Sequence, residues 1–146
     1  MEYSEENMVL RINSNYRELD DLYHEIALKI GITDSAFTIF YTIFKIGDGC
    51  LQRDICQESY TNKQTIHSAI QKLKLAGYLY LEQGKGRDKH IYLTESGKEI
   101  LRDKIGPLVN AEEEAFLALS MEEQKQFTAI FSKYVDGFRE RAEKLL

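Results

Sequence analysis

Residues 61–93 decide the fold, and they read TNKQTIHSAIQKLKLAGYLYLEQGKGRDKHIYL. The first half of this stretch carries apolar side chains at helical spacing: Ile66, Ala69, Ile70 and Leu73. Thr61 and Gln64 have the spacing of a capping box, and Gly77 is a residue typical of a helix C-terminus. We therefore expect a helix that begins near Thr61 and ends before Gly77.

The second half of the stretch predicts a β-hairpin. Two runs, Leu79–Glu82 and His90–Leu93, alternate between apolar and polar side chains with a period of two. Residues 83–89 lie between them and form a glycine-rich, basic loop. Alternation on both sides of such a loop is typical of an antiparallel hairpin with an exposed tip.

Helical patterns precede and follow this stretch. The expected helices are one from Ser4 to Gly31, one capped by Thr33 or Asp34, a short one over Leu51–Gln57, one capped by Thr94 that Pro107 kinks or breaks, and one opened by a capping box at Ser120–Glu123. The inward face of the second of these is predicted to hold Ala36, Phe37, Phe40, Ile43, Phe44 and Gly47. A short helix, a turn, a capped helix and a hairpin, in that order, predict a winged helix-turn-helix. The expected fold class is mainly α with a small β-hairpin wing.

Length and composition exclude several classes of protein. The chain has 146 residues, a length that indicates one domain, and its net charge is −5. No apolar run approaches the ~18 residues of a membrane span, and residues 1–10 lack the features of a signal peptide. Two cysteines, Cys50 and Cys56, are too few for a disulfide framework. We expect a cytoplasmic protein without a cofactor.

The basic residues are concentrated in one part of the chain. Residues 61–90 carry six basic and two acidic side chains, whereas the other residues carry 13 basic and 22 acidic ones. A basic island in an acidic chain is typical of a protein that binds a polyanion with one face. A chance cluster of charges on a solvated surface would give the same count.

The predicted helix and hairpin supply the side chains that a double-stranded DNA site needs. A helix fits the major groove, and its N-terminal half can reach the edges of the bases. A basic hairpin can reach the backbone or the minor groove, where an arginine meets enhanced negative potential. The predicted DNA-binding residues are Thr61, Asn62, Lys63, Gln64, Thr65, His67, Ser68, Gln71 and Lys74 on the helix, and Lys85, Arg87 and Lys89 in the hairpin.

These motifs together resemble the MarR family of bacterial transcriptional regulators, over nearly the whole chain. The resemblance rests on Asn62-Lys63-Gln64-Thr65-Ile66, Leu73, Gly77-Tyr78, Leu93-Thr94-Glu95-Ser96-Gly97, Gly31-Ile32-Thr33, Pro107, Ala111-Glu112 and Ser120–Glu123. It implies one winged-helix regulator domain over residues 1–146, with a DNA-binding lobe (33–94) and an α-helical dimerisation lobe (1–30 and 95–146). In the family's wing an Asp-x-Arg motif braces the arginine. Here the arginine is Arg87, and Lys85 stands at the position of the aspartate.

The resemblance also implies a homodimer on a pseudo-palindromic operator, in which the first and last helices of both subunits interlock. The residues predicted for this interface are Val9, Ile12, Tyr16, Phe127, Phe131, Tyr134 and Phe138. The strict heptad spacing from Val9 to Ile30 fits such a seam, and equally a helix that faces the core of one subunit. Many members are repressors released by small phenolic or lipophilic ligands that bind between the lobes. Tyr16, Tyr23, Phe37, Phe40 and Tyr41 could line such a pocket, and core packing would explain the same residues.

Other functions have weaker support in the sequence. Cys50 and Cys56 could form a thiol sensor of oxidants, but six positions apart on a helix they face different sides, which favours inert thiols. His24, His67 and His90 lack the spacing of metal ligands, which favours surface or nucleic-acid contacts. No catalytic motif is present, so we expect no enzyme. Some winged helices are protein-interaction modules that do not bind DNA, although these usually lack a cationic recognition helix.

Overall fold

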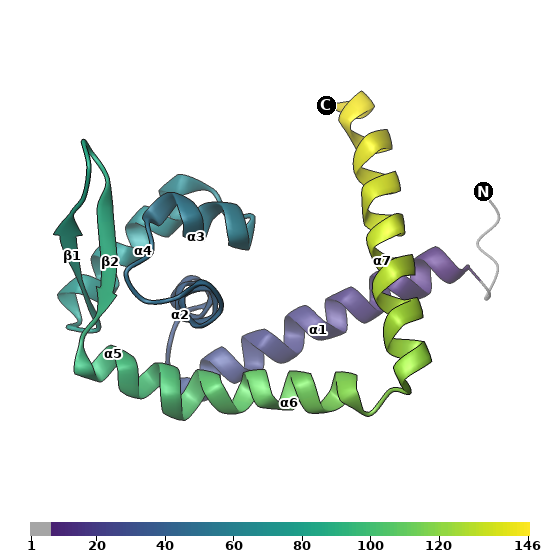
Figure 1. Ribbon diagram of the computed structural model, residues 1–146, viewed down its shortest axis with the longest axis horizontal. Coiled ribbons are helices and arrows are strands. Elements are labelled where there is room, and N and C mark those ends of the chain that lie inside the picture. The colour runs from purple at the N-terminus through teal and green to yellow at the C-terminus, as the bar shows by residue number, and fades with distance from the viewer. Residues whose placement is uncertain (1–6) are drawn as a thin grey trace. The chain divides into compact units, whose positions relative to one another are not determined.

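The structure, a computed structural model, describes residues 7–146 and separates into two compact units that divide between Ile105 and Gly106 (Figure 1). The first unit holds α1 (Met8–Ile30), α2 (Asp34–Ile46), α3 (Gln52–Ser59), α4 (Lys63–Leu75), β1 (Leu79–Gln83), β2 (Lys89–Leu93), α5 (Glu95–Ile100) and a π-helical turn (Leu101–Ile105). The second unit holds α6 (Gly106–Leu117), α7 (Met121–Ala142) and a 3₁₀ turn (Glu143–Leu145). The predicted class, mainly α with a two-stranded hairpin, is confirmed. The boundaries of the two predicted lobes stay a prediction.

The core of the first unit forms where α2, α3 and α4 pack against one another and β1 packs against α4. Its fully buried side chains are Phe40, Ile39, Ile43, Ile55, Ile66, Ile70, Leu79, Ile91 and Ile105. The prediction for α2 was correct for Ala36, Phe37, Phe40 and Ile43. It was wrong for Phe44, which is 41% exposed on the last turn, and for Gly47, which is the exposed C-cap. The buried stripe instead runs through Ile39, three residues after Ala36 and four before Ile43.

The ends of α1 and α2 follow the expected chemistry of helix caps. Asn7 caps the described start of α1, because its Oδ1 accepts from the backbone N–H of Val9 (3.1 Å) and of Leu10 (3.3 Å). The predicted start at Ser4 lies outside the described residues. Gly31 ends α1 in the left-handed region at φ 88°, and the Thr33 hydroxyl caps α2, as predicted.

The two helices of the helix-turn-helix differ by one or two residues from the expected bounds. The short helix α3 runs from Gln52 to Ser59 rather than over Leu51–Gln57. The predicted capping box of Thr61 and Gln64 is wrong, because Asn62 is the N-cap of α4 and its Oδ1 accepts from Thr65 N at 2.8 Å. The Thr61 hydroxyl instead donates to the carbonyl of Ser59 in the preceding turn.

The wing is an antiparallel hairpin in which Tyr80 pairs with Tyr92, and their rings stack with centroids 5.6 Å apart. The segment before α3 lies along β2. The Gly49 N–H donates to Ile91 O, Ile91 N–H donates to Cys50 O, and Leu51 forms a single bridge with His90. These bonds hold the wing against the entrance of the helix-turn-helix.

Pro107 was expected to kink or break the helix after the wing, and the chain stays helical there. The Thr94 hydroxyl caps α5, as predicted. Pro107 does not break the helix, because it is the second residue of α6, a position where the missing N–H disrupts little, and a wider π-helical turn precedes it. The capping box of Ser120 and Glu123 opens α7, as predicted, with both reciprocal bonds present.

Candidate nucleic-acid interface

The N-terminal half of α4 presents a polar face to solvent. Lys63, Gln64, His67 and Ser68 are exposed, while Ile66 and Ile70 on the opposite side are buried. This division follows from the helical spacing of the apolar residues. The polar face can therefore meet a partner without disturbing the core.

A groove of about 560 Å³ lies between α3, α4 and the wing (Figure 1 shows the three elements). It brings together five predicted DNA-binding residues from two elements: Lys63, His67, Gln71, Arg87 and Lys89. The charged side chains in its lining are Arg53, Lys63, Arg87, Lys89 and Asp88. Four cations against one carboxylate give the groove a positive potential, which suits a polyanion.

The other predicted residues do not line this groove. Gln64, Thr65 and Ser68 line a second cleft, on the flank of α4 that faces Gly31–Ala36. Lys74 and Lys85 are exposed and line neither cleft, and Asn62 is exposed while its side chain caps the helix. Thr61 is half-buried in the turn. The predicted set thus covers two flanks of α4 and the wing.

The tip of the wing has its own hydrogen bonds. Asp88 N–H donates to Lys85 O, Gly84 N–H donates to Asp88 O, and the Gln83 side chain donates to Gly86 O at 2.7 Å. These bonds fold residues 83–88 into a tight turn. The Arg87 side chain is exposed beside it.

Arg53 was missed by the sequence analysis. Its Nη1 lies 3.4 Å from Asp88 Oδ1, so an ion pair connects the wing to α3. The wing has no acid two positions before Arg87, and the acid that follows it, Asp88, pairs with α3 instead. The two partners are 35 positions apart and only the fold brings them together, so no local motif could have indicated this contact.

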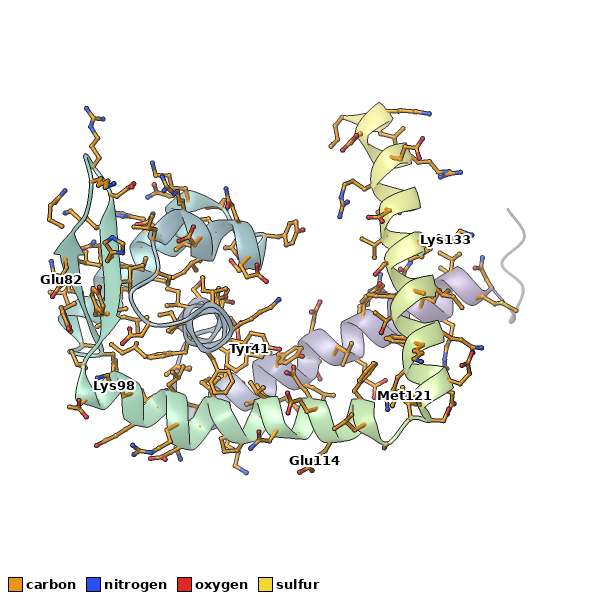
Figure 2. All side chains as sticks on the ribbon, viewed as in Figure 1. Tyr41, Glu82, Lys98, Glu114, Met121 and Lys133 are labelled. Atoms are coloured by element: carbon orange, nitrogen blue, oxygen red, sulfur yellow. The ribbon has the colours of Figure 1, made fainter. Side chains whose placement is uncertain are left out.

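A cavity of about 380 Å³ lies among α1, α2 and α3. Three of the five predicted pocket residues line it, and their rings contact one another: Tyr23 and Phe37 (centroids 5.9 Å apart), Tyr23 and Tyr41 (6.2 Å), and Phe37 and Tyr41 (5.9 Å). Tyr41 projects from α2 in Figure 2. Phe40 is placed elsewhere, fully buried in the core against Tyr78, and Tyr16 does not line the cavity.

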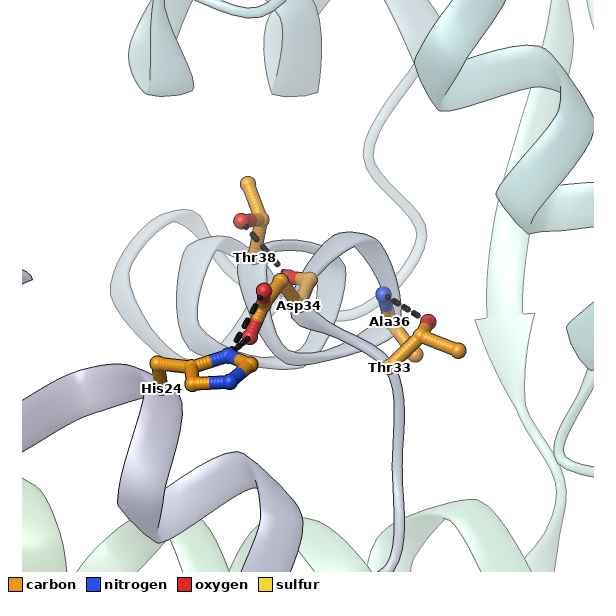
Figure 3. Close-up of polar contacts among 5 residues, drawn as sticks. All are labelled: His24, Thr33, Asp34, Ala36 and Thr38. Atoms are coloured by element: carbon orange, nitrogen blue, oxygen red, sulfur yellow. Dashed lines mark hydrogen bonds and ion pairs between the residues drawn. The ribbon is translucent and has the colours of Figure 1, made fainter. Parts of the chain in front are cut away.

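Two polar pairs border the same cavity. His24 Nδ1 on α1 lies 2.9 Å from the carboxylate of Asp34 on α2 (Figure 3). The hydrogen bond to this carboxylate, and then its charge, raise the pKa of His24 above the ordinary 6.5. Lys45 on α2 forms an ion pair with Glu58 on α3.

The remaining candidate residues are not arranged for chemistry. Burial, with Asp54 and Asp48 nearby, raises the pKa of Cys50 to about 11, and burial also raises the pKa of Cys56. A raised pKa keeps a thiol protonated, which is the opposite of what an oxidant sensor needs. His90 Nδ1 lies 2.7 Å from Gly49 O, and residues 7–146 contain no cluster of three metal-ligating side chains. No single helix in that range is long and apolar enough to cross a bilayer.

Comparison with known proteins identifies the fold. Residues 30–88 match the MarR family model. A MarR family regulator from Neisseria meningitidis is 15% identical, with a TM-score of 0.80 over 96% of this chain and 99% of that one. S. aureus MepR, in a complex with DNA, is 22% identical, with a TM-score of 0.69 over 94% and 99%.

A third solved structure is Bordetella bronchiseptica BpsR, whose DNA binding is regulated by 6-hydroxynicotinic acid. It is 15% identical, with a TM-score of 0.63 over 86% of this chain and 98% of that one. No curated protein sequence matches the chain. Residues 30–88 therefore match the MarR family model, and the chain as a whole has the winged helix-turn-helix fold of the solved MarR family regulators.

Proposed function

We propose that this protein is a transcriptional regulator that binds double-stranded DNA through α4 and the wing. The observation that carries the proposal is the basic groove between α3, α4 and the hairpin, with four cations against one carboxylate. Phosphate contacts supply much of the affinity of DNA-binding proteins, and they require such a surface. The same fold binds DNA in MepR. We propose a cytoplasmic location, which is typical of regulators of this family.

The geometry of α4 fits the major groove. Its exposed N-terminal half carries side chains that can both donate and accept hydrogen bonds, such as Gln64 and Ser68. We propose that Lys63 and Lys74 contact phosphates and that Arg87 on the wing reaches the adjoining minor groove. In this division the polar side chains of α4 read the bases, and the phosphate contacts fix the register of the protein on the duplex.

We further propose that the protein works as a homodimer. Apolar side chains on α1 and α7 are unusually exposed: Val9, Tyr16, Phe127, Tyr134 and Phe138 are between 36% and 64% exposed, and Ile12 and Phe131 are half-buried. Exposed apolar patches of this kind mark interfaces. A twofold dimer would present two α4 helices to half-sites roughly 34–36 Å apart on a pseudo-palindromic operator.

A ligand-responsive repressor is the mode of regulation that we propose. The aromatic cavity among α1, α2 and α3 lies in the unit that also carries the recognition helix. Its volume of about 380 Å³ is in the range of small-molecule sites. A ligand there would contact α2, which packs against α4, and could shift the position of α4. In BpsR, which shares this fold, 6-hydroxynicotinic acid regulates DNA binding.

The proposal is tested by selection of bound sequences from random duplex DNA, followed by titration of the selected duplex at several salt concentrations. We expect a pseudo-palindrome, and an affinity that falls by about 0.9 log units per log unit of salt for each phosphate contacted. Absence of binding to any duplex, even at low salt, would refute DNA binding and favour a protein-interaction module.

Two matched variants test whether the basic groove is the surface that contacts DNA. Lys63→Ala removes a cation from the groove, whereas Lys98→Ala removes an exposed cation from α5, outside the groove lining. We expect Lys63→Ala to weaken binding and to lower the salt slope by about one, because one phosphate contact is lost. Equal effects of the two variants would show that the groove is not the contact surface.

A further inference from the structure

The aromatic cavity among α1, α2 and α3 has a charge that indicates which class of ligand it takes. Its ionisable lining residues, apart from the two tyrosines, are three carboxylates, one lysine and one histidine: Asp20, Asp34, Glu58, Lys45 and His24. The inference rests on the proposed role of this cavity as an effector site. It concerns the charge of the effector, which the fold does not determine.

Both basic side chains in the lining already have a carboxylate partner. His24 is bound to Asp34, as Figure 3 shows, and Lys45 is bound to Glu58. An anionic ligand would have to displace one of these carboxylates to reach a positive charge. Separating a charge from its partner costs free energy, so the cavity disfavours an aromatic acid.

The third carboxylate is the one that remains available to a ligand. Asp20 is exposed on α1, and it takes part in none of the ion pairs formed by residues 7–146. It borders the cavity together with Tyr23, which lies one helical turn further along α1. A cation held against Tyr23 would therefore also be within the field of Asp20.

The aromatic residues supply the complementary surface. Tyr23, Phe37 and Tyr41 form a cluster in which each ring contacts the other two, with Phe37 and Tyr41 stacked at 26°. The faces of aromatic rings carry partial negative charge and attract cations within about 6 Å of the ring centre. Aromatic rings pack against one another in offset-stacked or edge-to-face arrangements, and a planar aromatic ligand can make the same contacts.

We propose that this cavity binds a small planar aromatic cation, with the ring system packed on Tyr23, Phe37 and Tyr41 and the positive group facing Asp20. An aromatic carboxylate of the same size is rejected, because it would meet Asp20 without an available cation. Charge thus separates this effector from aromatic acids that fit the same space.

The test compares two probes that share a ring system and have planar head groups of similar size but opposite charge. Binding of 2-naphthamidine, a cation, and of 2-naphthoate, an anion, is measured by calorimetry at neutral pH on the protein without DNA. We expect the cation to bind on the order of tenfold more tightly, from one favourable against one unfavourable charge contact in a half-solvated site. Comparable affinities, tighter binding of the acid, or no binding of either probe would overturn the proposal.

Variants on α1 separate the role of Asp20 from the charge of the whole protein. Asp20→Asn should weaken binding of the cation by about three- to fivefold, and Asp20→Lys should reverse the preference of the cavity. Asp21→Asn is the matched control, because Asp21 is its exposed neighbour on the same helix and does not line the cavity. Equal effects of Asp20→Asn and Asp21→Asn would refute the assigned contact.

The readout is independent of DNA binding. If the cation binds as expected but no duplex is retained by the protein, the proposed function fails and the ligand class stands. If DNA is bound and the cavity prefers the acid, the proposed function stands and the ligand class fails. The two failures are thus distinguishable.

Discussion

Gly97 in α5 is the position where one added methyl group should do the most damage. A Cβ atom there would lie 2.1 Å from the carbonyl oxygen of Tyr78, whereas real Cβ contacts essentially never fall below 3.0 Å. The backbone would have to move by about 1 Å to relieve this overlap. Because the atom in the way is backbone, no side-chain rotation can make room.

The carbonyl of Tyr78 cannot move easily. It accepts the N–H of Thr94 at 3.1 Å, and the Thr94 hydroxyl donates to the neighbouring carbonyl of Gly77 at 2.6 Å. These bonds join the entrance of the wing to its exit, where α5 begins. We therefore expect Gly97→Ala to destabilise the protein by about 2–3 kcal/mol, the upper part of the range for overpacking.

Urea denaturation followed by circular dichroism measures this effect. With a slope of about 1–3 kcal/mol/M, the midpoint should fall by on the order of 1 M. Gly137→Ala in α7 is the control, because a Cβ there meets only the far end of the Arg141 side chain, at 3.5 Å. That variant should be neutral or more stable by up to about 1 kcal/mol, since alanine favours a helix. A midpoint for Gly97→Ala at or above that of the wild type would refute the reasoning.

Three further predictions concern charges. Asp88→Asn removes the one carboxylate from the groove lining, so affinity for random duplex should rise by about two- to fivefold at low salt. A double-mutant cycle of protein stability with Arg53→Gln should show a coupling of less than about 1 kcal/mol, because both side chains are partly exposed. His24 has a higher pKa in the folded protein than in the unfolded chain, where it is about 6.5. The stabilisation from its pairing with Asp34 is therefore complete at pH values below about 6.5, and it is lost as the pH rises through the pKa of the folded state. Thermal melts at acid and alkaline pH should therefore show wild type exceeding His24→Gln on the acid side only, and an equal difference at all pH values would contradict this. Cys50, whose pKa is about 11, should react slowly with iodoacetamide at neutral pH, and rapid labelling of the folded protein would contradict its burial.

Local sequence patterns predicted most of the secondary structure. Neighbouring residues were enough to indicate the helical spacing and the alternation around the basic loop. They also indicated the helix caps at Thr33, Thr94 and Ser120. The errors in secondary structure lay at the ends of helices, where one or two residues determine the position of the cap. Asn62 took the capping position from Thr61 because either side chain can cap a helix and the path of the preceding turn chooses between them.

The sites depended more on the fold. The sequence indicated a basic helix and a basic loop, and the structure brought five of their residues into one groove. It also added Arg53, and it separated Gln64, Thr65 and Ser68 onto another flank of α4. Helical spacing indicates which residues share a face, but not which element lies opposite that face.

The sequence by itself determined the order of helices and hairpin and the basic character of residues 61–90, because both depend on residues close together in the chain. Only the tertiary structure decided the pairing of Arg53 with Asp88, the burial of Phe40 away from the aromatic cavity, and the pairing of His24 with Asp34. These contacts join separate elements of the chain, and the packing of the elements sets their distances. The pattern of neighbouring residues indicates whether a segment forms a helix or a strand. The residues that the segment contacts in other elements are determined only when the core forms.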